Sequence, residues 1–593
     1  MTLERLCDIF YYQKEKYPLQ KSIAGKENGA WKTYSTDEVI DIINQLSLGL
    51  LALGIGKGDK VGIISYNRPE WTFIDQAVLQ IGAINVPVYP NISEHEIQFI
   101  FADAGVKMVC VSNEELFNKV KEVQQQLPLL KHIFTFNKIP NARHWKEVME
   151  AGKGGSLTKV DELKNTIKKE DLATIIYTSG TTGEPKGVML SHNNVISNVL
   201  AAHPIFPISH GEIGLSFLPL NHIFERMVSY LYMSKGVSVY FVEGTDTIVA
   251  DLKEVKPQIF TTVPRLLEKV YERIVSTGLA LTGIKRAIFF KSLNIGLEYN
   301  DEGNNSFFYN LKLFIASKLV FVKWREALGG NIRAIVSGGA ALQPRLAKVF
   351  TAAGLPVMEG YGLTETSPVV SVNHLVKGEC KLGTVGIVLD GVTVKFANDG
   401  EICVKGPNVM MGYYNHPDRT KEVIDTDGYF HTGDIGEIVE GKFLKITDRK
   451  KELFKTSGGK YVAPSPIENK MRESFLIEQM MVVGEGRKFV SALIVPSIPN
   501  LKDWCNKNEI PFKDIKEVLK NPEVLKEYSD IIDKMNQNFS HVEQVKRFKL
   551  LPEEWTISAG ELTPTLKVKR KVILEKYKNE IAEIYKDEHL VEV

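Results

Sequence analysis

Cysteine is scarce in this sequence, and its spacing fits no metal or redox motif. Only five cysteines occur in 593 residues, and no two of them form a CxxC pair or a zinc-finger pair. We therefore expect free thiols in a reducing compartment. Excess charge is also lacking, because 73 Lys and Arg residues face 72 Asp and Glu residues, for a net charge of +1. This balance argues against a strongly basic nucleic-acid binder and against an acidic disordered chain.

Uninterrupted hydrophobic runs are missing as well. The long uncharged stretches 76–93 and 187–211 are broken by Asn, Gln, His or Pro, so neither predicts a membrane span. The first residues carry acidic groups on both sides of Arg5 and no apolar block behind them, so we expect no secretory signal. At about 150 residues per domain, the length predicts about four units, or two large domains with subdomains. Together these absences indicate a cytoplasmic protein of several domains.

The first part of the chain alternates helical and strand patterns. Apolar residues at helical spacing predict a helix over 38–53, which ends at a pair of glycines. The next segments predict, in order, a strand at 60–65, a helix at 71–81, a strand at 83–88, a helix at 94–104 and a strand at 108–112. Such strand–helix units imply a largely parallel sheet covered by helices, and the same alternation returns between residues 248 and 357.

The last third of the chain has a different pattern of predicted elements. Short β-like runs lie between Gly- and Asp-rich turns at 392–396, 401–404, 435–439 and 443–446, as in a small β-rich subdomain. A charged stretch then precedes a Lys- and Glu-rich α+β segment. The predicted fold class is therefore α/β: a large N-terminal domain of βα-type subdomains with a small β-rich subdomain (1–447), a hinge (448–453) and a small α+β C-terminal domain (454–593).

The strongest local signal for chemistry is the segment 174–188, a β-branched strand that runs into a loop with three glycines, four hydroxyls and Lys186. Glycines let backbone N–H groups close around phosphate oxygens, hydroxyls add donors, and the lysine supplies a positive charge. The segment departs from the Walker pattern GxxxxGK[ST], because Lys186 is followed by glycine, so a P-loop ATPase is disfavoured. A plain Gly/Thr turn would not require so many donors beside a lysine.

At this point the sequence resembles the acyl-adenylate-forming superfamily of acyl-CoA synthetases, luciferases and peptide-synthetase adenylation domains. Six motifs of that family occur in order, at residues 174–188, 337–342, 359–366, 429–434, 447–451 and 562–570. A seventh segment, Leu218-Pro219-Leu220-Asn221-His222-Ile223-Phe224-Glu225-Arg226, is similar to the form found in long-chain acyl-CoA synthetases. Two departures stand out: Ala341 replaces a frequent proline, and Arg226 stands where some bacterial relatives carry a gate tryptophan. A tryptophan-gated tunnel is therefore not expected.

Several of these residues also have a physical interpretation of their own. Tyr361, between two glycines, offers a flat face on which a base can stack, or it is a core tyrosine. Glu365 suits Mg²⁺ on ATP phosphates, or it caps a helix. Asp434 can accept hydrogen bonds from ribose hydroxyls, or it is a turn aspartate. His222 lies near the carboxylate and adenylate in relatives, although a structural histidine remains open.

Lys567 follows a Thr-Pro-Thr turn and precedes the basic residues 569–571. Taken alone, this segment is typical of a solvated basic face. The resemblance instead implies a mobile loop that delivers the Lys567 ammonium to the transition state of adenylate formation. The register of the family motif selects Lys567 over Lys569 and Lys571.

The resemblance implies a full set of site residues. The expected catalytic residues are Lys186, His222, Glu365 and Lys567. The expected ATP/AMP-binding residues are Thr178, Ser179, Gly180, Thr181, Thr182, Gly183, Lys186, Gly339, Ala340, Ala341, Glu359, Gly360, Tyr361, Gly362, Thr364, Asp434, Arg449 and Lys567. The hinge residues are Asp448 and the pivot Lys451, the coenzyme A channel is Ser457, Gly458, Gly459 and Lys460, and Mg²⁺ is held by Glu365 and Thr178.

Residues 306–325 contain four basic residues and no acidic residue. Phe308, Leu311, Ile315, Leu319 and Val322 form a helical stripe within this segment. A basic amphipathic helix suggests contact with a membrane surface or a lipid. A helix docked on the core is the equally open alternative, because other apolar residues fall off the stripe. The surrounding stretch, about 276–330, resembles an insertion of long-chain synthetases.

The expected function is that of a long-chain fatty acyl-CoA synthetase. It would use ATP, Mg²⁺ and coenzyme A, form acyl-AMP with release of pyrophosphate, and then make the thioester as the small domain turns about the hinge. Two alternatives stay open. Within the same superfamily, the protein could adenylate an aryl or shorter acid, or load a carrier protein. From a different class, it could be a catalytically silent, membrane-associated lipid-binding relative. No carrier domain follows in the sequence, which weighs against an assembly-line enzyme. The expected location is cytoplasmic, with peripheral contact at the inner membrane face, and an oligomer stays open.

Overall fold

The computed structural model describes residues 2–178, 184–244, 246–300, 305–563 and 568–586. These residues form two compact units. The first contains residues 1–395, 403–432 and 438–444, and the second contains residues 396–402, 433–437 and 445–593. Short pieces of the β-rich region thus belong to the second unit rather than to the first.

One sheet of the first unit has the strand order β19-β9-β8-β4-β3-β5-β6-β7. Its strands are β3 (Lys60–Ile64), β4 (Ile84–Val88), β5 (Val106–Val111), β6 (His132–Thr135), β7 (Arg143–His144), β8 (Leu172–Thr178), β9 (Lys186–Ser191) and β19 (Gly412–Tyr413). The strands from β8 to β7 pair in parallel, whereas β9 is antiparallel to both β8 and β19. A largely parallel sheet is thus confirmed, with an antiparallel edge that the strand patterns did not predict.

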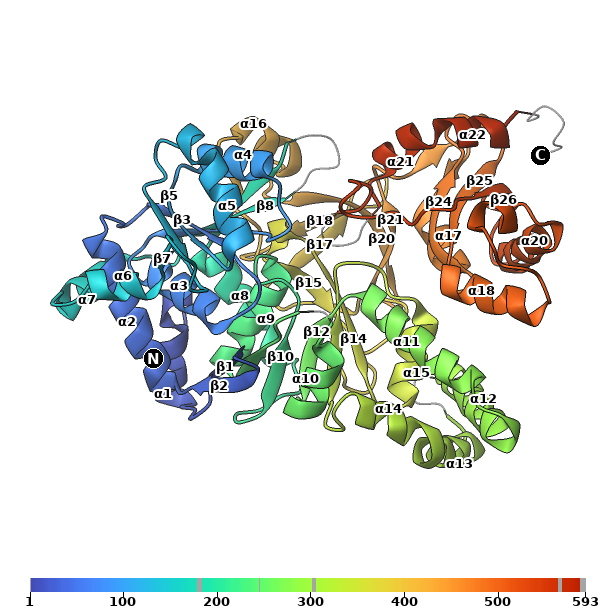
Figure 1. Ribbon diagram of the computed structural model, residues 1–593, viewed down its shortest axis with the longest axis horizontal. Helices are drawn as coiled ribbons and strands as arrows, with labels where there is room; N and C mark the ends of the chain where they lie inside the picture. Colours follow the sequence, from blue (N-terminus) through green and yellow to red (C-terminus); the bar gives the residue numbers. More distant parts are fainter. Residues whose placement is uncertain (1, 179–183, 245, 301–304, 564–567, 587–593) are drawn as a thin grey trace. The chain divides into compact units, whose positions relative to one another are not determined.

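Helices cover both faces of this sheet. Alternate residues of β3 and β5 pack against α2 (Thr36–Ala52) and α3 (Pro69–Gln80) on one side, and against α4 (Glu94–Ala104) and α5 (Glu114–Val123) on the other. Figure 1 shows these helices in blue around the β3–β5 strands. Burial on both faces explains why these strands read as continuous apolar runs.

The second sheet of the first unit has the order β16-β15-β14-β13-β12-β10-β11-β1-β2. Its strands are β1 (Ile23–Glu27), β2 (Ala30–Tyr34), β10 (Ile213–Ser216), β11 (Ser238–Phe241), β12 (Ile259–Thr262), β13 (Ala334–Ser337), β14 (Val357–Gly362), β15 (Val369–Val372) and β16 (Ile387–Val388). Pairing is parallel from β14 to β1 and antiparallel at both ends.

The remaining helices of this unit are α1 (Ile9–Lys16), α6 (Lys146–Ala151), α7 (Leu157–Thr166), α8 (His192–Ala202), α9 (Ile223–Ser234), α10 (Ile248–Val255), α11 (Pro264–Leu279), α12 (Gly283–Leu297), α13 (Phe307–Ala316), α14 (Val322–Ala327), α15 (Pro344–Ala352) and α16 (Pro417–Val423).

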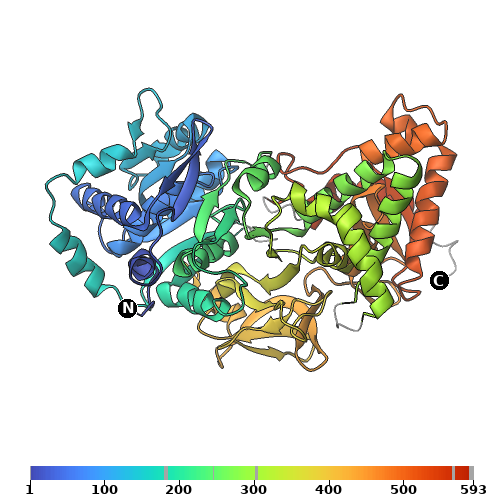
Figure 2. The ribbon, with the colours of Figure 1, turned by 90° about the horizontal axis from the view of Figure 1, so that it is seen from below.

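The β-rich region consists of β17 (Thr393–Phe396), β18 (Glu401–Lys405), β20 (Phe430–Val439) and β21 (Phe443–Arg449). Figure 2 shows these strands in yellow and orange. Their residues are divided between the two units. The expected runs are confirmed, but β20 begins five residues before the run predicted at 435–439. The segment His431–Asp434 is consequently extended strand, and Asp434 is not a turn aspartate.

The rest of the second unit is α+β. An antiparallel hairpin pairs β22 (Phe454–Lys455) with β23 (Tyr461–Val462), and a sheet has the order β24-β25-β26 (Ile477–Val483, Val490–Pro496 and Val545–Leu550). The helices are α17 (Pro464–Met471), α18 (Ile498–Lys507), α19 (Ile515–Val518), α20 (Pro522–Asn536), α21 (Arg570–Lys576) and α22 (Lys578–Ile584). Apolar clusters lie on both faces of the sheet.

Local sequence chemistry sets several helix boundaries. Ser35 and Glu38 form a reciprocal capping box that starts α2, and Ser93 and Glu96 do the same for α4. Gly105, at φ +68°, ends α4 in the left-handed conformation that glycine adopts most easily. Within the part of the chain that the structure describes, no helix is both long enough and apolar enough to span a bilayer.

A buried ion pair joins helices and strands of the first unit. Arg226 on α9 donates from Nη2 to Oδ1 of Asp75 on α3 at 2.5 Å, and from Nη1 to the Thr174 hydroxyl at 2.9 Å. Asp75 also accepts from the Tyr230 hydroxyl and from the Asn85 amide. The Arg226 and Asp75 side chains are 1% and 0% exposed. The arginine that replaces the gate tryptophan of some relatives is therefore a core residue.

Candidate active site

The phosphate-loop motif runs from the end of β8 to the start of β9. Thr178 is the last residue of β8 and lies opposite Lys186, the first residue of β9, in the antiparallel register. Both side chains are half-buried. The expected residues Ser179, Gly180, Thr181, Thr182 and Gly183 lie outside the described part of the chain. The two strand ends thus hold the hydroxyl and the ammonium at the base of this loop.

Tyr413 connects the phosphate-loop lysine to the predicted metal ligand. Its hydroxyl donates a hydrogen bond to Oε1 of Glu365 at 2.9 Å, and the ammonium of Lys186 lies 5.0 Å from the centre of its ring. Burial and the neighbouring Glu365 carboxylate raise the pKa of Tyr413, so the hydroxyl stays protonated and donates. Three chain segments therefore meet at one phenol, which orients the carboxylate and lies against the lysine.

Glu365 lies on a short 3₁₀ turn, Thr364–Thr366, just after β14. Its backbone carbonyl accepts from the Met410 amide at 2.9 Å, which fixes the turn against the segment that leads to β19. Tyr361 lies on β14 opposite Ser371 of β15 and is half-buried. A side chain at Gly362 would collide with the Pro368 carbonyl oxygen, so this position needs glycine. The buried Thr364 starts the turn.

The predicted adenine-side loop follows β13 and is tied down by Glu359. Gly339, Ala340 and Ala341 are exposed, and Gly339 has a φ of +82°. Glu359 on β14 is buried and accepts a hydrogen bond on Oε1 from the Leu342 amide at 3.0 Å. Burial raises the pKa of the Glu359 carboxyl to about 8. The Glu359 carboxyl thus fixes the end of this loop through its hydrogen bond with the Leu342 amide.

His222 caps helix α9. Its Nδ1 accepts a hydrogen bond from the Phe224 amide at 3.3 Å, which assigns the proton of the neutral ring to Nε2. The residue is only half-buried. The structural alternative left open by the sequence, a hydrogen-bonded histidine, is therefore present as a helix cap. In the first turn of α9, burial raises the pKa of Glu225 to about 8.

The donor set around Glu365 fits Mg²⁺. Among the residues that the structure describes, no group of three His, Cys, Asp or Glu side chains could hold a metal ion. Glu365 and Thr178 instead offer one carboxylate and one hydroxyl, both hard oxygen donors and both half-buried. Mg²⁺ is commonly bound by one or two carboxylates together with substrate phosphates, so this sparse set suits a metal that arrives with its nucleotide.

The second unit holds the predicted ribose-binding carboxylate. Asp434 on β20 is buried, and its Oδ1 accepts from Nε of Arg449 on β21 at 3.1 Å. The neighbouring Lys450 pairs with Asp399 at 2.7 Å and with Glu401 at 2.8 Å. These pairs raise the pKa of Lys450. Two of the predicted nucleotide-binding residues, Asp434 and Arg449, therefore pair with each other, beside a charged cluster that the sequence did not predict.

The predicted hinge and coenzyme A residues also lie in this unit. Asp448 is the next-to-last residue of β21. Its carboxylate accepts from the Arg449 amide at 2.6 Å and from the Ser465 hydroxyl at 3.1 Å, and burial raises its pKa to about 6. Lys451 follows in a turn. Ser457, Gly458, Gly459 and Lys460 form the exposed tip of the β22–β23 hairpin, with Gly459 at a φ of +74°.

Lys567 lies outside the described residues, but its flanks do not. Leu562 and Val568 form an antiparallel bridge, and the Lys569 amide donates to the Glu561 carbonyl at 2.8 Å. Arg570 donates from Nη1 to Glu468 at 2.6 Å. Arg570 is therefore an anchor for this segment and not part of a solvated basic face.

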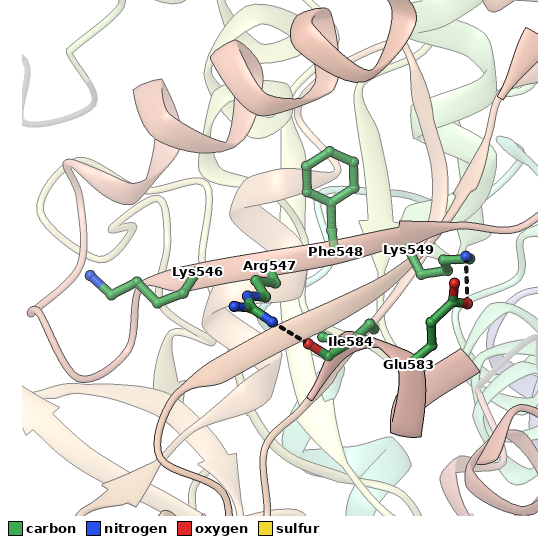
Figure 3. Close-up of a pocket in the computed structure, with 6 residues that line it drawn as sticks. All are labelled: Lys546, Arg547, Phe548, Lys549, Glu583 and Ile584. Carbon is green, nitrogen blue, oxygen red and sulfur yellow. Dashed lines mark hydrogen bonds and ion pairs between the residues drawn. The ribbon is translucent and has the colours of Figure 1, made fainter. Parts of the chain in front are cut away.

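A surface pocket of about 390 Å³ lies on β26 and α22 of the second unit and contains none of the predicted site residues. Figure 3 shows Arg547 directed to the Ile584 carbonyl, at 2.8 Å, and Lys549 directed to Glu583, also at 2.8 Å. Both cations are compensated within the unit, so we assign this pocket no part in the chemistry.

Comparison with known proteins identifies the family. A sequence profile described as AMP-binding enzyme matches residues 10–414, and one described as AMP-binding enzyme C-terminal domain matches residues 452–589. This chain belongs to the AMP-binding enzymes. It is 35% identical over 568 residues to the long-chain-fatty-acid–CoA ligase FadD15 of Mycobacterium tuberculosis, covering 95% of this chain and 94% of that protein. It is 34% identical to long-chain-fatty-acid–CoA ligase 5 of Mus musculus, covering 94% and 85% of the two chains.

Solved structures of AMP-binding enzymes have the same fold. The anthranilate CoA ligase AuaEII, in complex with anthranoyl-AMP, aligns with a TM-score of 0.72 at 16% identity over 98% of this chain and 99% of its own. ATP-bound MatB from Rhodopseudomonas palustris aligns with a TM-score of 0.72 at 22% identity, over 97% and 99%. The adenylate-forming fold expected from the sequence is therefore confirmed.

Sequence reasoning missed Tyr413. The residue belongs to none of the motifs matched above, and its sequence neighbours give no sign of a site. Only the antiparallel pairing of β19 with β9, which places Tyr413 opposite Val188, brings its ring to Lys186.

Proposed function

We propose that this enzyme is an AMP-forming long-chain fatty acid–CoA ligase. The observation that carries the proposal is the 35% identity to a long-chain-fatty-acid–CoA ligase over 95% of this chain and 94% of that protein. A match of this extent reaches through both family profiles, so it includes the adenylate-forming half and the C-terminal domain alike.

The reaction has two halves. A fatty-acid carboxylate oxygen attacks the α-phosphorus of ATP, the bond to the β-phosphate oxygen breaks, and pyrophosphate leaves. The thiol of coenzyme A then attacks the acyl carbon of acyl-AMP, the C–O bond to the phosphate breaks, and AMP leaves with the thiol proton released. Each half passes through an anionic transition state, which requires fixed positive charge and oriented donors.

The first unit supplies the groups for the phosphates. Lys186 lies at the base of the phosphate loop and stabilises negative charge on the transferred phosphate. Glu365 and Thr178 would hold Mg²⁺, which would offset negative charge on the phosphate oxygens of ATP. Tyr413 keeps the Glu365 carboxylate oriented by its 2.9 Å hydrogen bond. His222, which caps α9 through Nδ1, is proposed to lie near the carboxylate and the adenylate.

The nucleoside and coenzyme A are proposed to use the remaining predicted residues. Tyr361 stacks on adenine beside the loop of Gly339, and Asp434 accepts from the ribose hydroxyls. Arg449 supports this role, because its guanidinium holds one oxygen of Asp434. We also propose that 448–453 is the hinge between domains 1–447 and 454–593, with Lys451 as pivot. The exposed hairpin of Ser457–Lys460 then serves the pantetheine channel.

We place the enzyme in the cytoplasm, at the inner face of a membrane. Long-chain fatty acids partition into bilayers, so an enzyme that consumes them gains from contact with lipid. The segment 306–325 is the proposed contact, and its exposed apolar residues support it.

The test is formation of the coenzyme A thioester against a panel of straight-chain acids and one aryl acid, with AMP and ADP separated by chromatography. Thioester formation with long-chain acids, one AMP released for each thioester, is the expected result. Turnover of the aryl acid alone, or release of ADP, would contradict the assignment. Absence of turnover with every acid would favour a silent lipid-binding relative.

A further inference from the structure

The segment that the sequence left undecided divides its apolar residues between two faces. Helix α13, a π-helical turn at Ser317–Phe321 and helix α14 follow one another without a break. On one side, Ala316, Val320, Phe321 and Trp324 are buried. Trp324 packs edge-on against Phe350 of α15, with ring centroids 6.2 Å apart. Of the apolar residues that the sequence placed off the stripe, Phe321 therefore docks the segment on the core, whereas Phe314 does not.

Most of the predicted stripe is exposed, with exposed fractions of 73% for Phe308, 49% for Leu311, 50% for Ile315 and 53% for Leu319. The fifth member of the stripe, Val322, is half-buried. Two apolar residues outside the stripe are exposed as well, Phe307 at 76% and Phe314 at 60%. Single exposed apolar residues are ordinary in soluble proteins, but six of them between Phe307 and Leu319 form a patch. Such a patch marks a surface that binds something.

Helix α12 lies beside this patch and extends it. The Tyr309 hydroxyl donates to the Ile295 carbonyl at 2.7 Å, which ties α13 to α12 (Figure 1). Ile284 on α12 is 80% exposed and Ile288 is 38% exposed. The two helices therefore each expose apolar residues, and they are joined at the C-terminal end of α12.

Charge decides what the patch can bind. Residues 283–297 and 306–325 contain seven basic residues and no acidic residue. Six of the seven are exposed: Lys285, Arg286, Lys291, Lys312, Lys318 and Lys323. The exposed Glu298 and Glu326 stand at the ends of the two segments, and Asp301 and Glu302 lie in the sequence between them, so residues 283–325 carry seven basic and three acidic residues. Aromatic and aliphatic side chains surrounded by lysines are the composition of helices that insert into the interface of an anionic bilayer.

We infer that α12 and α13 form a docking surface for an anionic lipid bilayer. The phenylalanines and isoleucines enter the boundary between headgroups and acyl chains, while the lysines contact the lipid phosphates. A second copy of this chain fits the patch poorly, because a two-fold contact would bring two sets of like charges together. The benefit to catalysis rests on the proposed function, since a long-chain acid would be drawn from the same bilayer.

Binding of the full chain to vesicles tests the inference without any need for turnover. The probes are vesicles of phosphatidylcholine alone and of phosphatidylcholine with about one third phosphatidylglycerol, followed by sedimentation. Two double variants remove the two components of the surface: Phe307→Ser with Phe308→Ser, and Lys312→Glu with Lys318→Glu. Leu129→Ser with Val376→Ser is the matched control, since these residues are 50% and 59% exposed elsewhere in the first unit.

The wild type and the control should sediment with the anionic vesicles, and less so as salt is raised. Each surface variant should bind at least tenfold more weakly. Unchanged binding by both surface variants would overturn the inference, and so would equal affinity for the two kinds of vesicle. Gel filtration completes the test: a dimer that the Phe307→Ser, Phe308→Ser variant turns into a monomer would identify the patch as a self-interface and not a lipid site.

Thioester formation with detergent-dispersed fatty acid separates this inference from the proposed function. Both surface variants should keep the wild-type rate in that assay, because none of their substitutions touches the predicted site. A wild type that binds vesicles but never forms a thioester would defeat the proposed function and leave the lipid surface standing.

Discussion

The hydroxyl of Tyr413 donates a hydrogen bond to Glu365 at 2.9 Å, while the ring of the same tyrosine lies 5.0 Å from the ammonium of Lys186. One side chain thus touches both the proposed metal ligand and the phosphate-loop lysine. The hydroxyl hydrogen bond orients the Glu365 carboxylate, and the ring gives the Lys186 side chain a surface to lie against. Tyr413 therefore helps to position two groups that we propose to act on the triphosphate.

Tyr413→Phe should therefore slow adenylate formation while preserving the ring beside Lys186. A hydrogen bond to a charged group contributes about 1.5–3 kcal/mol, so we expect a loss of roughly tenfold or more and a higher Mg²⁺ requirement. Glu365→Gln, which removes the carboxylate, should cost on the order of 10²-fold or more. Pyrophosphate release measured against Mg²⁺ concentration gives both quantities. Tyr414→Phe is the matched control, and a Tyr413→Phe variant with the wild-type Mg²⁺ profile would refute the role of the phenol.

Lys567→Ala should separate the two half-reactions. The ammonium is proposed to act on the anionic transition state of adenylate formation, so pyrophosphate release should fall on the order of 10²- to 10³-fold. Thioester formation from supplied acyl-AMP and coenzyme A should remain near the wild-type rate. Lys571→Ala tests the register of the motif and should affect neither step. Unchanged pyrophosphate release in the Lys567→Ala variant would show that the wrong lysine has been assigned.

The Arg226–Asp75 pair should be important for stability and not for chemistry. Arg226→Met leaves the Asp75 carboxylate buried beside an apolar side chain, which costs about 3–5 kcal/mol in comparable cases. Adding Asp75→Asn should restore part of that loss, because the uncompensated charge is removed. Urea unfolding, followed by far-UV circular dichroism, gives the unfolding midpoints of the wild type, the single variant and the double variant, which are then compared. If the free energy of unfolding of Arg226→Met lay within about 0.5 kcal/mol of the wild-type value, the pair would not contribute to stability.

Glu359 should make stability depend on pH. Burial raises the pKa of its carboxyl to about 8, so the folded state binds this proton more tightly than the unfolded state does. The protonated carboxyl therefore adds to the free energy of unfolding. This stabilisation is fully present below the unfolded pKa of about 4.5 and is lost as pH rises through about 8. Glu359→Gln keeps the acceptor for the Leu342 amide and cannot ionise. Thermal midpoints from about pH 5 to about pH 8.5 should fall more steeply for the wild type, whereas parallel profiles would show that Glu359 does not titrate in this range.

Much of the fold could be predicted because local rules and tertiary packing agree. The helix predicted at 38–53 is found at Thr36–Ala52, where a capping box and a terminal glycine fix its ends. The strands predicted at 60–65 and 83–88 are found at Lys60–Ile64 and Ile84–Val88, because a parallel strand buried on both faces is a short apolar run. The antiparallel edge at β9 and β19 gave no such signal.

The sequence motifs nominate site residues one stretch of chain at a time, and they do not give the contacts between stretches. Asp434 and Arg449 come from different motifs, and their pairing on neighbouring strands is seen only in the structure. Tyr413 could not be found in this way, since its position depends on strand pairing between distant segments. The direction of the 306–325 helix was also out of reach, because a stripe of apolar residues does not reveal whether the stripe or its opposite face packs on the core.

The central claim is that this enzyme makes a fatty acyl-adenylate, and ATP–pyrophosphate exchange tests it most directly. Labelled pyrophosphate is supplied with ATP, Mg²⁺ and a fatty acid, in the absence of coenzyme A. The account predicts label entering ATP only when a fatty acid is present, with long-chain acids more effective than short or aryl acids. No exchange with any acid, from an enzyme that still forms a coenzyme A thioester, would contradict it.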